Sequence, residues 1–151
     1  MKAYSKQWVI LPLVGLLLLA SGCKKKITPP NERDLQLKAL RNSGLGWVVG
    51  STGSVTKDGF DVTSQYADFR LLVGVFTYTV ENSAGTAWPY TEGTWQFANE
   101  TGTILTRDDG VAIAIEIAGE KLALTFRVDD SSTGGRHSGL SGEYVFVLES
   151  E

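Results

Sequence analysis

The chain has 151 residues, of which 42% are hydrophobic and 21% charged, and its 14 Lys and Arg against 17 Asp and Glu give a net charge of −3. From Gly46 onward, six basic residues face fifteen acidic ones. A domain that binds DNA or RNA needs a basic patch for the phosphates. The acidic balance therefore argues against nucleic acid as a partner.

The first 22 residues have the layout of an export signal. Lys2 and Lys6 precede an apolar run at 8–20, which ends in the small residues Ala20-Ser21-Gly22. Such a run of about a dozen residues is shorter than the roughly 20 that span a bilayer. We therefore expect residues 1–22 to be a signal peptide that is removed.

Cys23, the only cysteine, directly follows these small residues. This stretch resembles the lipobox of bacterial lipoproteins, which implies cleavage before Cys23 and acylation of its thiol and of the new N-terminus with fatty acids such as palmitate. Two or three acyl chains anchor a protein durably, and Lys24 to Lys26 add attraction to anionic headgroups. The alternative is an ordinary secretory signal with a free thiol at the cut.

Lipoprotein sorting also gives an expected location. The residue after Cys23 is Lys24 rather than an aspartate. By resemblance to known lipoproteins, this implies the outer membrane of the cell envelope, with the domain facing the periplasm.

The remaining chain divides into a tether and one domain. Residues 23–31 form a short lipidated spacer, and residues 32–151 form the domain. Asn31 is a good N-cap for a helix at 32–42, which Gly44 ends. We expect the leucines of this short helix to lie on the domain and to plug one end of it.

After Gly46 the hydrophobic period changes to two, which is typical of half-buried strands. Short turn signals such as Gly119-Glu120 separate these strands and indicate hairpins. The predicted strands of this meander are 93–98, 103–107, 111–118 and 122–129, and a last strand is predicted at 143–149.

Two longer strands are predicted before the meander, at 47–56 and 69–81. The second has apolar residues on both faces, which favours a central strand or one wall of a barrel. Residues 61–67 leave open whether another strand is present. The sequence thus predicts an all-β antiparallel fold of about seven to eight strands, closed into a barrel or packed as a two-layer sandwich.

The sum of these features resembles the lipocalin-like lipoproteins of Gram-negative bacteria, a group of small envelope proteins. The resemblance is carried by the lipobox, the spacer, the short helix, the strand that opens on Trp47, and the stretches "GTWQF", "RDDG" and "GEYVFVLE". It implies a small meander β-barrel that holds an apolar or small amphipathic molecule.

Catalytic and metal-binding patterns are absent from the sequence. His137, the only histidine, stands in "GGRHSG" with no spacing that indicates a catalytic dyad or triad. Asp58 and Asp61 offer oxygens to calcium, but their spacing does not match an EF-hand loop, and aspartate with glycine is ordinary turn chemistry. We expect no enzyme activity, no metal and no cofactor.

The aromatic side chains are the best candidates for binding. We expect Trp88 and Tyr90, in "SAGTAWPYTEG", to be exposed in a loop at the mouth; the alternative is that this loop folds back over an open barrel end. For aromatics at strand positions the alternative is plain core packing. The strand candidates are Trp47, Trp95, Phe76 and Tyr78.

Two functional hypotheses follow. The first is a lipocalin-like binding module that takes up a small hydrophobic or amphipathic molecule at the envelope. The second is a non-catalytic structural module that docks another envelope protein through its mouth loops and Trp88. A filled interior, with large residues on every strand, would favour the second hypothesis.

Overall fold

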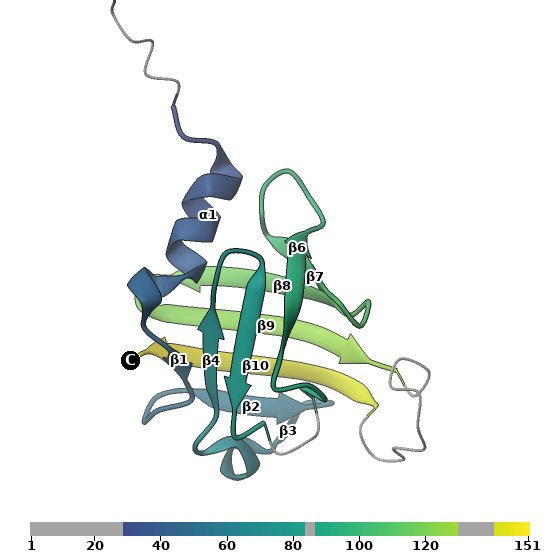
Figure 1. Cartoon of the computed structure of the whole chain (residues 1–151). Coiled ribbons are helices and arrows are strands. Elements are labelled where there is room, and N and C mark those ends of the chain that lie inside the picture. Colours follow the sequence, from purple (N-terminus) through teal and green to yellow (C-terminus); the bar gives the residue numbers. More distant parts are fainter. Residues whose placement is uncertain (1–28, 84–86, 130–140) are drawn as a thin grey trace, which may run out of the picture.

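The structure is a computed structural model, which describes residues 29–83, 87–129 and 141–151. Residues 1–28 and 130–140, with the predicted signal peptide, Cys23 and His137, lie outside the described part. The described residues form one α-helix, two short 3₁₀ segments and ten strands of a single antiparallel sheet (Figure 1). The predicted all-β class with one short N-terminal helix is confirmed.

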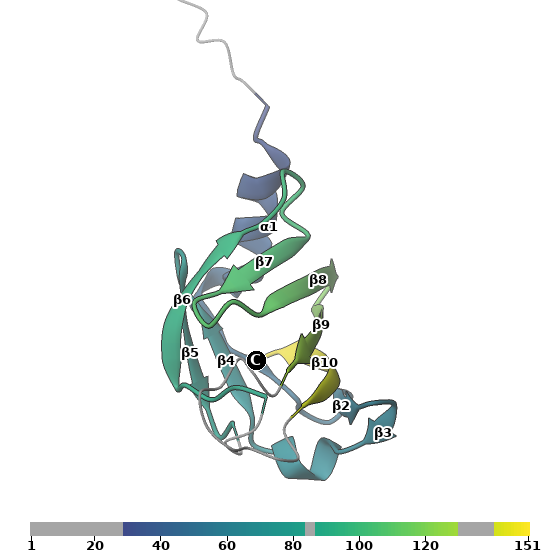
Figure 2. The same ribbon diagram turned by 90° about the vertical axis from the view of Figure 1, so that its right-hand side faces the viewer.

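Eight of the strands close into a barrel. From β4 to β10 each strand pairs with the next along the chain, and β1 pairs with both β4 and β10. Figure 2 shows β4 to β6 on one side of the barrel and β8 to β10 on the other. The strands of the ring are β1 (Trp47–Val48), β4 (Arg70–Val73), β5 (Thr77–Glu81), β6 (Glu92–Phe97), β7 (Ile104–Arg107), β8 (Ala112–Ala118), β9 (Lys121–Val128) and β10 (Gly142–Ser150).

The meander from β6 to β10 forms as predicted. Along β8 the buried Ile113 and Ile115 alternate with exposed Ala112, Ala114 and Glu116, so one face of the strand is inside and the other outside. The β8–β9 turn has Gly119 at a φ of 62°, which glycine adopts without steric cost. The period-two pattern was therefore sufficient to find these strands and their orientation.

The predicted first strand, 47–56, is wrong as a single element because it is interrupted. It forms β1 and β2 (Ser54–Lys57), both paired with β10. Trp47 and Val55 are eight positions apart in the chain, but their partners Ser150 and Phe146 on β10 are only four apart. Four residues of this segment therefore have no partner on β10. The Glu149 carboxylate holds this excursion by accepting from the Ser51 N–H and from the Thr52 hydroxyl.

Gly53 allows the chain between β1 and β2 to leave the sheet, and its substitution gives a testable prediction. A Cβ on Gly53 would collide with the carbonyl oxygens of Val49 and Val147, which are backbone atoms. We expect Gly53→Ala to destabilise the domain by about 1–3 kcal/mol or more, as overpacking does. Gly119→Ala is the control, because its Cβ meets open space and only the positive φ costs energy. Urea denaturation of both variants checks this, and a smaller loss for Gly53→Ala than for Gly119→Ala would contradict it.

The predicted second strand, 69–81, is wrong in a different way: it is a hairpin. Leu71 pairs with Val80, and the Gly74 N–H donates to the Thr77 carbonyl oxygen at 2.8 Å, which leaves Val75 and Phe76 as a two-residue loop. A two-residue loop moves the inward set from odd to even positions. This explains why apolar residues occupied both apparent faces of the supposed single strand.

The segment at 61–67, left open by the sequence, completes a small extension of the sheet. β3 (Phe60–Asp61) pairs with β2 outside the ring, and a 3₁₀ segment, η2 (Thr63–Tyr66), follows. Tyr66 is 1% exposed and packs its ring edge against Phe146 at 5.0 Å. The segment therefore adds an aromatic side chain to the core.

Helix α1 (Glu32–Leu40) packs on the barrel through its C-terminal end, so the expectation for its leucines is met in part. Asn31 caps it through a 2.8 Å bond from the Arg33 N–H, and a 3₁₀ segment, η1 (Asn42–Gly44), ends it. Leu40 is 1% exposed, and its carbonyl oxygen accepts from the Trp47 indole N–H at 2.7 Å. Leu35 is 52% exposed, so only part of the leucine set packs on the domain.

The N-terminal part of α1 lies beside the β6–β7 hairpin (Figure 2). The Arg33 guanidinium donates to the Asn99 carbonyl oxygen of that hairpin at 2.8 Å. Within the described ranges, no helix has both the length and the apolarity to cross a membrane.

Candidate functional site in the barrel interior

Trp88 lies inside the barrel, which corrects the expectation that it is exposed at the mouth. Its side chain is 3% exposed, so the alternative of a segment that folds inward is the one that the structure shows. Its ring centroid lies 5.5 Å from that of Tyr78 and 5.7 Å from that of Phe126, both edge to face. Trp88 therefore belongs to the aromatic core.

A buried guanidinium lies beside this indole. The Arg107 Cζ is 4.7 Å from the centroid of Trp88, within the range of a cation–π contact. Arg107 is 2% exposed, and its Nε and Nη2 donate to the two carboxylate oxygens of Asp109 at 2.9 and 2.6 Å. Its Nη1 donates to the Ala87 carbonyl oxygen at 3.0 Å. The charge is thus neutralised, and each of the three guanidinium nitrogens donates to an acceptor.

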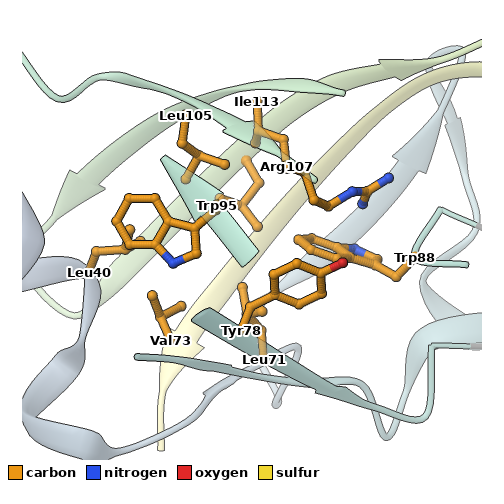
Figure 3. Close-up of a pocket in the computed structure, with 10 residues that line it drawn as sticks. Leu40, Leu71, Val73, Tyr78, Trp88, Trp95, Leu105, Arg107 and Ile113 are labelled. Carbon is orange, nitrogen blue, oxygen red and sulfur yellow. The ribbon is translucent and has the colours of Figure 1, made fainter. Parts of the chain in front are cut away.

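A small cavity of about 20 Å³ remains between these groups. Figure 3 shows Tyr78, Trp88 and Arg107 together on one side of it, and Leu40 and Trp95 on the other. A cavity of this size holds about one water molecule. At this cavity the described interior is therefore largely filled by the protein's own side chains, and the space left between them is smaller than a drug-sized ligand.

One polar atom in this interior has no partner. Among the described residues, the Trp88 Nε1 is the single buried side-chain nitrogen or oxygen without a hydrogen bond. The indole N–H groups of Trp47 and Trp95 donate to backbone carbonyl oxygens at 2.7 and 3.1 Å. Buried polar groups are nearly always paired, so an unpaired donor is an exception that marks this position.

Tyr78 completes the polar part of the site. Burial raises the pKa of its phenol well above the ordinary value, so the hydroxyl stays protonated. It donates to the Asp108 Oδ1 at 3.3 Å, and the Asp108 Oδ2 accepts from the Thr94 N–H at 2.9 Å. Asp108 and Asp109 of the β7–β8 turn therefore orient both Tyr78 and Arg107.

The structure brings three of the six candidate aromatics together. Trp88, Tyr78 and Trp95 line the cavity, whereas the buried Trp47 is bonded to α1. Phe76, 48% exposed, stands in the β4–β5 loop and contacts the Trp95 ring at 5.4 Å, and Tyr90 is 56% exposed.

Sequence reasoning missed Arg107 because "RDDG" was interpreted only as a turn. The signal was present: Arg107 is two residues after Leu105, and the alternation of β7 places both on the inward face. An arginine at an inward strand position, followed by aspartates, indicates a buried ion pair.

Metal ligation and catalysis gain no support from the described residues, in which no group of three or more His, Cys, Asp or Glu is placed to hold an ion. The cavity lining offers the Arg107 guanidinium, the Tyr78 phenol and the indoles of Trp88 and Trp95. Such groups can bind and orient a molecule.

A second charged cluster, on the barrel seam, gives the pH dependence of stability. Glu151 accepts from the Arg70 Nη2 at 2.6 Å and from the Gly46 N–H at 3.3 Å, so it links the chain ends of β10, β4 and β1. The hydrogen bond from Arg70 is the largest cause that lowers the pKa of Glu151, and the bond from the Gly46 N–H lowers it further. A lowered folded pKa contributes stability that is present above the unfolded value of about 4.3 and is lost as the pH falls through the folded pKa.

We therefore expect wild type to be more stable than Glu151→Gln at neutral pH, with the difference disappearing as the pH falls below about 4. Thermal unfolding between pH 7 and pH 3 measures this. Glu116→Gln, which removes an exposed carboxylate from β8, is the control. A Glu151→Gln variant whose difference from wild type is the same at every pH would contradict the assignment.

Comparison of the chain with protein-family models, with curated proteins and with solved structures finds no match.

Proposed function

We propose that this protein is a lipid-anchored lipoprotein of the cell envelope whose non-catalytic barrel binds a small amphipathic molecule with an aromatic part. The observation that carries the binding function is the unpaired Trp88 indole N–H beside the buried Arg107 guanidinium. A barrel that served only as a packed scaffold would be expected to satisfy its buried polar groups. Here the most polar part of the core is also the part that is imperfectly filled.

The anchor is proposed from the sequence around Cys23, which places the thiol directly after a signal-like segment. The described chain begins near α1, and residues 24–31 reach at most about 3.3–3.6 Å each. The α1 end of the barrel would therefore lie within roughly 25–30 Å of the bilayer surface. We place the protein at the outer membrane, facing the periplasm, on the evidence of Lys24.

The anchor is tested by the mass and the location of the mature chain. Intact mass spectrometry should show an N-terminus at Cys23 that carries acyl chains, and Cys23→Ser should move the protein from the membrane fraction to the soluble or uncleaved form. A wild-type chain that is cleaved elsewhere and carries no lipid would remove the anchor from the proposal.

The binding function is tested by native mass spectrometry of the whole chain, purified in mild detergent from its host membranes. We expect a reproducible additional mass, below about 1 kDa, that is lost on denaturation and belongs to an aromatic compound. A clean unliganded mass, also after exposure to an extract of envelope lipids and metabolites, would overturn the binding function.

A second candidate function is favoured by the size of the cavity. An interior with only about 20 Å³ of free space suits a structural module that docks an envelope protein through its outer surface. Since Trp88 is buried, docking would rely on other side chains. The most exposed large apolar ones are Phe60, at 76%, and Tyr90, at 56%. The clean mass described above is the result that this candidate expects.

A further inference from the structure

The barrel strands form a compartment around an indole that no strand supplies. Tyr78 of β5, Phe126 of β9 and Phe146 of β10 place their ring centroids 5.5, 5.7 and 6.5 Å from that of Trp88. Arg107 of β7 lies against the indole face. These four residues are the cage; Trp88 lies outside the strands, between β5 and β6 in sequence. The cage would therefore remain around any flat ring that filled it.

The pair Ala87 and Trp88 gives the cage two groups: a planar ring and a carbonyl oxygen. The ring stacks on Arg107, and the Ala87 oxygen accepts from the Arg107 Nη1. The other two bonds of the guanidinium go to Asp109, on the β7–β8 turn. If Ala87 and Trp88 moved out, Asp109 would still hold Arg107 in place. The guanidinium would then offer its Nη1 as a donor and one open face to a ligand.

The indole is an imperfect occupant of this cage. Its Nε1–H is buried without an acceptor, which costs roughly 1–3 kcal/mol. An aromatic ring without a donor at that position would make the same stacking contacts and avoid this cost. Trp88 is therefore open to displacement on energetic grounds, unlike Trp47 and Trp95, whose N–H groups are bonded.

We propose that the cage is a ligand site which Ala87 and Trp88 occupy in the free protein, and that its ligand is an uncharged molecule that combines a planar aromatic ring with a carbonyl oxygen. The inference rests on the proposed function and names the class of ligand. Asp109 already neutralises Arg107, so a carboxylate ligand would bring an uncompensated buried charge. A carbonyl oxygen would take over the bond from Nη1 without that cost.

Acetophenone is the probe, since it has a ring and a carbonyl oxygen and neither a charge nor a donor. Ethylbenzene, which lacks the oxygen, and benzoate, which is charged, are its matched controls. The full-length chain is labelled with 5-fluorotryptophan, and Trp88→Phe identifies the Trp88 resonance. We expect acetophenone to move this ¹⁹F resonance toward that of a solvent-exposed tryptophan, with Trp47, which does not line the cavity, little changed. Both controls should bind at least tenfold more weakly.

The affinity of a variant without the occupant gives a second measurement. When a site is open only in a minor population, the apparent Kd rises by the inverse of that fraction. Trp88→Ala should therefore bind acetophenone at least tenfold more tightly than wild type. If Trp88→Ala does not fold, Trp88→Leu, which keeps more of the volume, should show a smaller gain in the same direction.

A Trp88 resonance that stays unmoved at high acetophenone, or a folded variant with wild-type affinity, would overturn the inference. These failures are separable from failure of the proposed function. A natural aromatic adduct in native mass spectrometry, with the Trp88 resonance unchanged by acetophenone, would contradict the proposed cage site and still support the binding function. Displacement of Trp88 by acetophenone, with no natural adduct, would support the cage and sink the binding function.

Discussion

Asp109→Asn is expected to lower the free energy of unfolding by about 3–5 kcal/mol, the largest effect of a single polar substitution in this domain. The side chains of Arg107 and Asp109 are 1% and 4% exposed, and two bonds of 2.9 and 2.6 Å join them. Asparagine has nearly the same shape but no charge. It would leave the guanidinium uncompensated in the barrel interior, where water cannot replace the lost partner.

The chain contains a matched control for this prediction. Arg127 and Asp129 repeat the Arg-x-Asp spacing at the end of β9, with a 3.3 Å contact, but each side chain is 67% exposed. Exposed pairs of this kind contribute about 0–1 kcal/mol, so Asp129→Asn should change stability by less than 1 kcal/mol. Urea denaturation gives the free energy of unfolding of both variants. The two ion pairs have the same sequence spacing, so a difference between the losses reports the effect of burial. Equal losses would show that the burial of the Arg107 pair does not determine its strength.

A double variant separates the charge from the shape of the pair. In Arg107→Met with Asp109→Asn, the buried charge is gone together with its partner. Because much of the loss in Asp109→Asn comes from the unpaired charge, the double variant should be more stable than Asp109→Asn alone. A double variant that is less stable would instead indicate that the contacts of Arg107 with Trp88 and Ala87 dominate.

The sequence predicted the meander well and the first half of the barrel poorly, for a physical reason. In β6 to β10 each strand has one buried face, and the three turns that join β6 to β9 contain glycine or aspartate, so period and turn chemistry agree. In the β4–β5 hairpin the turn residues are Val75 and Phe76, and Phe76 takes a φ of 61°, which bulky residues rarely adopt. The apolar loop hides the turn, and only Gly74 marks it.

The interrupted first strand failed for the opposite reason, because its signal was present but ambiguous. Gly50 and Gly53 lie within a run of β-forming residues, where glycine is compatible with a strand, a bulge or an excursion. The choice is made by Glu149, which accepts hydrogen bonds from Ser51 and Thr52, 98 and 97 positions earlier in the chain. Such a long-range contact leaves no local pattern.

The sequence indicated that aromatic residues form the candidate site, but it did not indicate which of them lie together in the barrel interior. Tyr78 and Trp95 were found only as aromatic residues at predicted strand positions, which does not decide whether they pack in the core or bind a ligand. Trp88 was found for its loop position, but an apolar loop residue can face water or fold into a core, and no periodicity decides between them. Arg107 was missed because a charged residue at an inward position opposes the usual pattern until Asp109 is known to pair with it.

The largest loss from an apolar substitution is expected for Phe146→Ala, at about 3–5 kcal/mol. Phe146 is 0% exposed and lies at the centre of the aromatic core. Its ring centroid is within 6.5 Å of those of five other rings, which belong to Tyr66, Phe69, Trp88, Phe126 and Tyr144. Removing the ring leaves a cavity that these neighbours, held on η2, β9, β10 and two connecting segments, can only partly fill.

Phe60→Ala is the same substitution at the other extreme of burial, because Phe60 is 76% exposed on β3. It should change stability by no more than about 0.5 kcal/mol. Thermal unfolding should therefore lower the Tm of Phe146→Ala by roughly 10–20 °C and leave Phe60→Ala close to wild type. A Phe146→Ala variant within a few degrees of wild type would mean that the aromatic core can close around the gap, and hence that the cage around Trp88 is not rigid enough to select a planar ligand.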